Sequence, residues 1–235
     1  GKADLVLAGG ADLLTDFYFE VLNHFRTLSP QDGGREGARP FDRHRNGCVA
    51  AEAAGMLCLE RRSHAESRGA LIYGEVDGWG MASAPAPLTG WPADDAGARL
   101  ALQRALDAAG CQPAQVDLIY AAANGGQTLD DLEGEALGKV FGSGGDGPVV
   151  TAVKGALGES FAGGAVRTAA AALSLIESKI PPTMGLNEPA TPLNHALTPI
   201  QDASIGRVVV NAMAPGGTFV ALVLKGDACE RKEAP

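Results

Sequence analysis

Short apolar runs without alternating polar residues recur along this chain, and they limit its possible folds more than any other feature. Runs of this kind are typical of strands that are buried on both faces. They predict strands at 3–10, 55–60, 70–76, 116–121, 148–153, 207–211 and 218–224. Several are separated by segments with helical spacing. The sequence therefore predicts a layered α/β architecture.

The predicted helices lie at 60–67, 94–109, 130–141 and 164–179. The second has the strongest pattern, because Ala98, Leu102 and Ala105 share one face, Asp94 or Asp95 can cap its start, and Gly110 follows its end. The last is rich in small residues, which favours close packing between sheets. A tight hairpin is expected at Gly216 and Gly217, and the aromatic-rich segment 15–28 is the least sheet-like.

Composition excludes several classes of function. The formal net charge of -9 and the pI near 4.9 argue against nucleic acid or an anionic membrane as the main partner, because both require clustered Lys and Arg. No apolar run approaches the roughly 18 residues of a membrane span. The four cysteines form no CxxC pair and no zinc-like spacing with histidine. We expect a cytoplasmic protein with no metal and no cofactor.

Two segments in the first two thirds of the chain carry a family pattern. RPFD at 39–42 is followed by GCVAAEAAGMLCLE at 47–60, and VDLIYAAANGG at 116–126 is followed by an acid-rich run from Asp130. Together with the segments described next, they resemble the ketosynthase family, which reads RPFD, GFVxGEGAGxLxLE and VDYVNAHGTST. This family comprises the ketoacyl-ACP synthases and the related ketosynthase and chain-length-factor subunits of type II polyketide systems.

According to the resemblance, alanine and glutamate occupy the positions of the family's two catalytic histidines. A gapless match on Asp130 and Glu133 puts the first histidine at Ala122 and the motif's threonine at Asn124. The family's KSxxGH matches at Lys154 and Gly158, so the second histidine is Glu159. The segment NAMAPGGTFVALVL at 211–224 resembles the terminal NSFGFGGTN hairpin, with Met213 and Pro215 at the two phenylalanine positions.

The resemblance implies a thiolase-like layered α/β/α/β/α fold, of which this chain is the C-terminal portion. Residues 1–62 are expected to end the N-terminal ketosynthase half, residues 69–225 to form the C-terminal half, and residues 226–235 to form a tail. The strand at 3–10 would then be an inner strand with neighbours outside this chain. A complementary N-terminal segment is therefore an expected partner, since an open edge and an uncovered apolar face favour aggregation.

The reaction of the family explains why the replaced histidines matter. A cysteine thiolate takes the acyl chain from an acyl carrier protein, and two neutral imidazoles assist decarboxylation and stabilise the enolate or oxyanion. Ala122 offers no donor, and the carboxylate of Glu159 would repel a developing anion. Losing one such donor typically costs on the order of 100- to 1000-fold in rate. The family's nucleophile lies upstream of residue 3, and Cys48 and Cys58 are interpreted as small core residues.

The favoured hypothesis is a chain-length-factor-like subunit without catalytic activity alone. The LDDLEGEA run at 129–136 resembles that subunit, which pairs with an active ketosynthase, shapes the elongation tunnel and works on chains bound to acyl carrier protein. The candidates for lining the channel are Phe17, Phe25, Met213 and Asn124. The aromatic residues at 17, 18, 19 and 25 fit a channel lining and a plain core equally well.

Two other hypotheses stay open. One is an atypical ketosynthase or acyltransferase with its cysteine on a separate N-terminal segment and with Asn124 or Glu159 in new roles. The other is a scaffold that only stabilises its partner. Lys154 is expected to pair with Glu159 or Glu133, and structural or solvent-facing roles are expected for the four histidines, His24, His44, His64 and His195.

Overall fold

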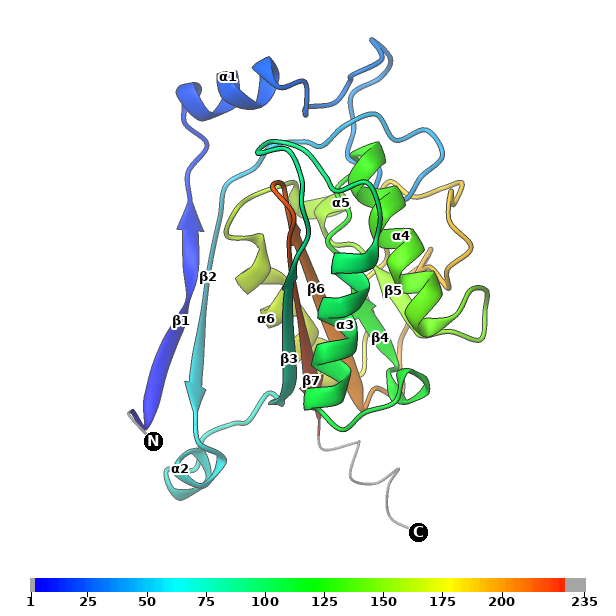
Figure 1. Cartoon of the computed structure of the whole chain (residues 1–235). Helices are drawn as coiled ribbons and strands as arrows, with labels where there is room; N and C mark the ends of the chain where they lie inside the picture. The colour runs from blue at the N-terminus through cyan, green and yellow to red at the C-terminus, as the bar shows by residue number, and fades with distance from the viewer. Residues whose placement is uncertain (1–2, 227–235) are drawn as a thin grey trace.

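The computed structural model describes residues 3–226, which form two sheets with helices on either side of the larger one (Figure 1). The strands are β1 Leu5–Asp12, β2 Ala53–Glu60, β3 Glu75–Ser83, β4 Leu118–Tyr120, β5 Val149–Thr151, β6 Arg207–Ala214 and β7 Thr218–Lys225. The helices are α1 Asp16–His24, α2 Arg62–Ser67, α3 Ala96–Ala108, α4 Gln127–Phe141, α5 Lys154–Leu157 and α6 Gly163–Glu177, with a single 3-10 turn, η1, at Pro113–Gln115.

The larger sheet has five strands in the order β3-β7-β6-β4-β5. Strands β3, β7 and β6 are antiparallel neighbours, while β4 runs parallel to both β6 and β5. The β6–β7 hairpin closes at Gly216 and Gly217, both with φ of 83°, a conformation that favours glycine. The expected hairpin is confirmed.

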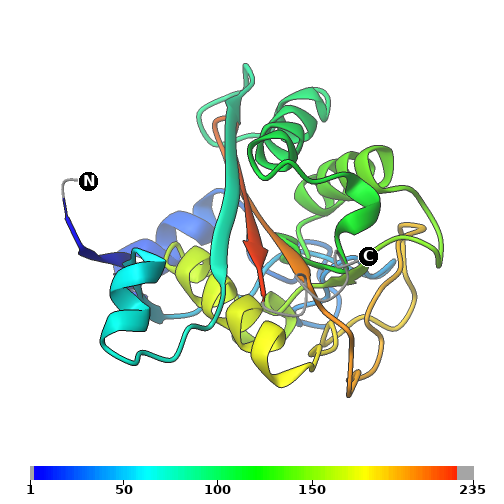
Figure 2. The same ribbon diagram turned by 90° about the horizontal axis from the view of Figure 1, so that it is seen from below.

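Helices cover both faces of this sheet (Figure 2). One core joins α3 and α4 to the sheet, and a second core joins α6 to its other face. Helix α3 lies unusually close to β3, because a Cβ on Gly80 would be only 2.2 Å from the carbonyl oxygen of Ala101. Helix α6 also contacts β2, so the order of layers is helices, sheet, helix, ribbon.

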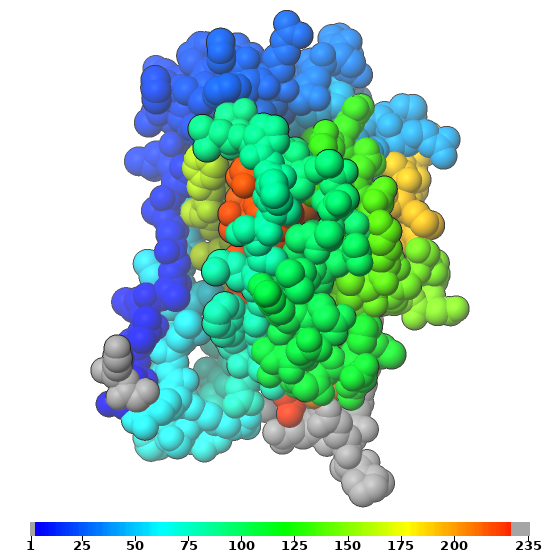
Figure 3. All heavy atoms as spheres, in the orientation of Figure 1, coloured from blue at the N-terminus to red at the C-terminus, as the bar shows by residue number. Residues whose placement is uncertain are grey.

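The ribbon of β1 and β2 is the exposed layer of the molecule. Its strands pair antiparallel from Leu5 opposite Glu60 to Asp12 opposite Ala53. The prediction of a buried first strand is wrong for this chain: Leu5, Val6 and Leu7 are 44–65% exposed, because nothing in residues 3–226 covers their face. In Figure 3 the blue atoms of this strand stand at the margin of the molecule.

Most predicted elements are confirmed, and the main differences are in the following segments. The strand predicted at 70–76 instead starts at Glu75, where its pairing with Lys225 of β7 begins. Helix α4 starts three residues earlier than expected, and neither the nine-residue α1 nor the four-residue α5 was predicted. The expected tail at 226–235 lies outside the described residues except for Gly226. Among residues 3–226 no helix is long and apolar enough to cross a membrane.

Candidate functional site

The site positions gather where the parallel strands of the large sheet end. Ala122 and Asn124 follow β4, Lys154 opens α5 after β5, and Asn211 lies in β6 beside them. The carboxyl ends of neighbouring parallel strands meet at one sheet edge, where α/β proteins bind ligands. The structure thus brings together the positions that the sequence matched to the family's two histidines.

Glu159 is held by an ammonium and an amide. The Nζ of Lys154 donates to both carboxylate oxygens of Glu159, at 2.8 and 2.6 Å, and the Nδ2 of Asn124 donates to Oε2 at 2.5 Å. Asn124 is fixed in this orientation because its Oδ1 accepts from the backbone N–H of Gly126. The expected pairing of Lys154 is therefore with Glu159. Three hydrogen bonds occupy this carboxylate.

The backbone of Glu159 also joins α5 to the N-terminal part of the chain. Its N–H donates to the carbonyl of Val49 at 2.8 Å, and its carbonyl accepts from the N–H of Ala51 at 2.9 Å. Both the backbone and the side chain of Glu159 therefore connect segments that are far apart in sequence.

Glu133 shapes the loop that contains Ala122. Its carboxylate is fully buried and accepts from the N–H groups of Ala122 and Ala123, both at 2.7 Å, and from the Nδ2 of Asn211 at 2.6 Å. Burial raises the pKa of Glu133, while these hydrogen bonds and the charge of Arg167 oppose the rise. Ala122 itself is fully buried and offers only a methyl group to the site.

Asp130 supports the same loop one helical turn earlier. It accepts from the N–H groups of Phe41 at 2.7 Å and Asn124 at 3.0 Å. Burial raises the pKa of Asp130 to about 7, although these bonds and the nearby guanidinium of Arg45 favour its charged form. This carboxyl group ties the 39–42 segment to α4.

Arg167 is the site residue that the sequence analysis missed. It lies on the buried face of α6 with a relative exposure of 4%, and burial lowers its pKa against the opposing charges of Glu159 and Glu133. Its Nε has no hydrogen-bond partner, and neither has the Oδ1 of Asn211. A signal was present, because position 167 precedes Ala171 by one turn on the apolar face of the helix. Burial likewise lowers the pKa of Lys154, against the charge of Glu159.

An aromatic pair stands beside Glu159. The rings of Tyr18 and Phe161 are 5.1 Å apart, and the carboxylate of Asp12 accepts from the N–H of Phe161 at 2.8 Å. Burial and the charges of Asp12 and Glu159 raise the pKa of Tyr18 to about 12. Phe161 also lines a hollow of about 400 Å³ between the ribbon, α6 and the large sheet.

Cys48, the cysteine near Glu159, does not supply a reactive thiol. Cys48 is buried as expected, and burial with the charge of Glu159 raises its pKa to about 11. The prediction that Cys58 is a core residue is wrong, since its strand β2 is exposed on that face. Among the described residues no three His, Cys, Asp or Glu side chains are arranged to hold a metal ion.

The predicted channel residues do not gather at one place. Phe17 is 79% and Phe25 51% exposed on α1 and at its end, and α1 buries none of its residues. Met213 packs against the core of α3 and α4, while Asn124 belongs to the charged cluster. The plain-core interpretation is wrong for Phe17 and Phe25 within this chain, because no described segment covers α1.

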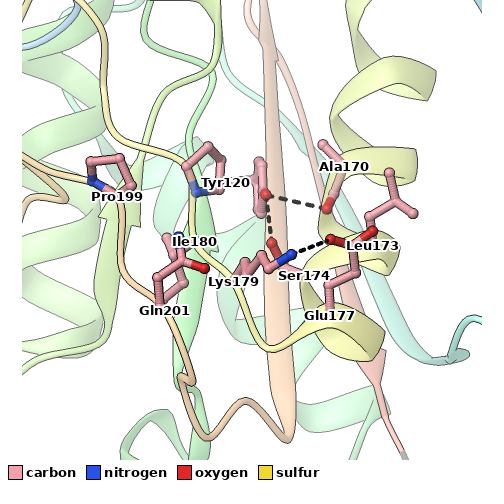
Figure 4. Close-up of a pocket in the computed structure, with 10 residues that line it drawn as sticks. Tyr120, Ala170, Leu173, Ser174, Glu177, Lys179, Ile180, Pro199 and Gln201 are labelled. Atoms are coloured by element: carbon pink, nitrogen blue, oxygen red, sulfur yellow. Dashed lines mark hydrogen bonds and ion pairs between the residues drawn. The ribbon is translucent and has the colours of Figure 1, made fainter.

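A second hollow lies at the other end of α6 (Figure 4). At its base the hydroxyl groups of Tyr120 and Ser174 are 2.8 Å apart, and an exposed Lys179–Glu177 pair stands at its rim. Its walls are mostly apolar, including Leu173. The polar groups at its base are already bonded to one another, so this hollow presents no convergent polar groups of the kind that fix a ligand.

Comparisons with known proteins agree with this geometry. Residues 1–65 match the model of the beta-ketoacyl synthase N-terminal domain, and residues 73–187 match that of the C-terminal domain. The chain belongs to the beta-ketoacyl synthase family. Its layers are the C-terminal portion of the thiolase-like fold, as predicted.

Similar curated proteins include bacterial and plant 3-oxoacyl-[acyl-carrier-protein] synthases. The 3-oxoacyl-[acyl-carrier-protein] synthase 2 of Rhizobium meliloti is 32% identical over 96% of this chain and 55% of its own length. The mitochondrial enzyme of Arabidopsis thaliana is 31% identical over 95% of this chain and 50% of its own length. This beta-ketoacyl synthase chain therefore spans about half the length of these relatives.

Solved structures extend the likeness. The ishigamide ketosynthase/chain length factor has a TM-score of 0.88 at 32% identity and covers 96% of this chain, which in turn covers 54% of that one. A type II polyketide synthase acyl-carrier protein in complex with its ketosynthase bound to the hexaketide has a TM-score of 0.90 at 25% identity. The matched region of that structure covers 96% of this chain and 57% of the solved chain.

Proposed function

We propose that this beta-ketoacyl synthase chain is a non-catalytic, chain-length-factor-like subunit. It pairs with an active ketosynthase and shapes the tunnel in which a polyketide or polyene chain grows on acyl carrier protein. The observation that carries the proposal is the Lys154–Glu159–Asn124 cluster, where a carboxylate occupies the second histidine position. A carboxylate disfavours the anion that condensation develops, and Ala122 supplies no compensating donor.

The partners follow from the relatives and from the exposed surface. Similar structures contain a ketosynthase, a chain length factor or an acyl-carrier protein, as their titles state. The uncovered faces of β1 and α1 expose Leu5, Leu7 and Phe17, and this amount of apolar surface is typical of an interaction site. We propose that a complementary N-terminal segment of the same fold covers β1, and that residues 1–62 and 69–225 are the two ketosynthase portions of this chain.

The free thiols of Cys48, Cys58 and Cys111 are consistent with a reducing compartment, and we propose the cytoplasm.

The residues that we propose to line the channel are Phe17, Phe25, Met213 and Asn124, and we add Phe161 to them. Phe161 is 77% exposed, is two residues from Glu159 and lines the 400 Å³ hollow.

The test is reconstitution with an active ketosynthase and acyl carrier protein, followed by mass analysis of the products. Replacing Phe161 or Met213 by Ala and by Trp should change product length while the rate of chain initiation is retained. Leu88, which is 89% exposed, provides a matched control substitution. Unchanged product length in every channel variant would overturn the tunnel role and leave only a scaffold. An acyl adduct on this chain after incubation with acyl carrier protein thioesters would instead establish the acyltransferase alternative.

A further inference from the structure

Phe161, the residue that we add to the proposed channel, is an exposed ring on a short connection. It lies between Glu159 and the start of α6 at Gly163, and 77% of the residue is exposed. An exposed side chain changes rotamer freely, so by itself it gives a channel no defined wall. A fixed position for this ring therefore depends on contacts from other parts of the chain.

Asp12, the last residue of β1, holds the backbone of this connection. Its Oδ2 accepts from the N–H of Phe161 at 2.8 Å and from the hydroxyl of Ser160 at 3.1 Å. Asp12 and Phe161 are 149 residues apart in the sequence. Because hydrogen bonds to an ionised acceptor are about twice as strong as neutral ones, this carboxylate anchors the connection to the β1–β2 ribbon.

The ring of Phe161 is held by the segment that follows Asp12. Tyr18 on α1 packs against it in a tilted arrangement, with 5.1 Å between the ring centroids. The turn between β1 and α1 is itself fixed, because the N–H of Leu14 donates to the carboxylate of Glu52 at 3.0 Å. Residues 12–18 therefore contact both the backbone and the ring of Phe161.

The other strand of the ribbon holds the neighbouring residue in a similar way. The backbone of Glu159 is bonded to Val49 and Ala51, which directly precede β2. The two strands of the ribbon thus meet residues 159–161 at the same end, one through a carboxylate and one through its backbone. The position of this segment depends on the ribbon as well as on α6.

We propose that Asp12 is a positioning residue that fixes Phe161 at the edge of the 400 Å³ hollow and thereby sets the length of the product. Asp12 acts through Phe161 and does not touch the growing chain. This role rests on the channel function proposed above for Phe161. Without the carboxylate, the backbone at Phe161 loses its anchor and the ring samples several rotamers, so that the wall it forms is no longer defined.

The contact itself is tested in the full chain by amide hydrogen exchange. Asp12→Ala should speed exchange of the Phe161 N–H by about tenfold or more, because a bond to a charged acceptor is lost. Asp12→Asn keeps a neutral carbonyl acceptor and should give about a threefold increase, which decides the matter if Asp12→Ala does not fold. Asp4→Ala is the matched control, since Asp4 precedes the same strand and pairs with the exposed Arg61. Unchanged exchange in the Asp12 variants, or an equal increase in Asp4→Ala, would overturn the proposal.

The effect on product length is tested in the complex reconstituted with an active ketosynthase and acyl carrier protein. Asp12→Ala should change product length in the same direction as Phe161→Ala, and Asp12→Asn should change it less. The double variant of Asp12→Ala and Phe161→Ala should give the products of Phe161→Ala alone, because Asp12 acts through that ring. A further change in the double variant would contradict this order of action.

The two proposals fail in different ways. A change of product length in Phe161→Ala without one in Asp12→Ala would overturn the positioning role and leave the channel function intact. No change of length in either variant would overturn the channel function, even where Asp12→Ala speeds exchange of the Phe161 N–H.

Discussion

Two carboxylates of the candidate site, Glu133 and Glu159, differ in which groups hold them. Glu133 on α4 accepts two backbone N–H groups and an amide, with no ammonium in contact. Glu159, after α5, is bound by the ammonium of Lys154 and the amide of Asn124. The first shapes the backbone of the loop after β4, while the second stands at the position that the sequence analysis matched to a catalytic histidine of the family. The difference teaches that a carboxylate bound by backbone N–H groups supports the fold, whereas one bound by side chains joins separate segments at the candidate site.

Removing the carboxylate of Glu133, which accepts backbone N–H groups, should have the largest effect on the stability of the fold. Glu133→Gln leaves a single amide oxygen for three donors and a buried NH₂ facing an N–H group. We expect the free energy of unfolding to fall by about 3 kcal/mol or more, measured by urea denaturation. Glu135→Gln is the control on the same helix, since Glu135 is exposed and pairs only with Lys139. A loss below about 0.5 kcal/mol in Glu133→Gln would show that the loop does not depend on this carboxylate.

Breaking the ion pair of Glu159 with Lys154 should lower the free energy of unfolding by less than Glu133→Gln does, because the carboxylate of Glu159 is partly exposed. Lys154→Met should lower the free energy of unfolding by about 2 kcal/mol, and adding Glu159→Leu should recover most of this loss. A double-mutant cycle measures the coupling directly. The exposed pair of Lys179 and Glu177 is the matched control, with an expected coupling below about 1 kcal/mol. Additive effects at 154 and 159 would contradict the pairing.

The raised pKa of Asp130 should be visible in how the free energy of unfolding depends on pH. Its pKa rises from 3.8 to about 7 on folding, so between pH 4 and pH 7 the folded chain keeps a proton that the unfolded chain has lost. Stability contributed by this group therefore falls as pH rises through that window. Asp130→Asn should flatten the profile relative to the unmodified chain. His195 opposes this trend, because burial lowers its pKa, and it is present in both proteins.

The smallest effect concerns Cys48, whose thiol lies near Glu159. Because its pKa is raised to about 11, iodoacetamide at pH 8 should modify Cys48 much more slowly than the exposed Cys58, as followed by peptide mass analysis. Glu159→Gln removes an anion and should speed the reaction of Cys48 modestly. Rapid modification of Cys48 in the unmodified chain would mean that a nucleophile is present after all.

Sequence patterns predicted the framework because it depends on local periodicity and turn residues. Helix α3 and the β6–β7 hairpin follow from apolar spacing and from paired glycines, and the family motifs located Ala122 and Glu159. The pattern at 70–74 was misleading because Leu71 and Tyr73 are apolar but 68% and 48% exposed, and no strand among residues 3–226 pairs with them. Strand pairing is a tertiary property that a single segment does not contain.

The charged cluster was only partly predictable for a similar reason. Lys154 and Glu159 are five residues apart and share a motif, so their pairing could be expected. Arg167 on α6 and Asn211 on β6 reach the site through the packing of the helix on the sheet. Only the three-dimensional structure shows that the Nε of Arg167 and the Oδ1 of Asn211 have no hydrogen-bond partner. Exposure of β1 likewise depends on which layers are present, which its apolar composition does not reveal.

The central claim, that the cluster around Glu159 is structural and not catalytic, is tested most directly in the reconstituted complex. The measurement is the condensation rate with the double variant Lys154→Met and Glu159→Leu, in which both charges are removed together. We predict a rate within about twofold of the unmodified complex, provided that both assemble equally. A fall on the order of 100-fold, as expected for loss of a catalytic group, would contradict the account.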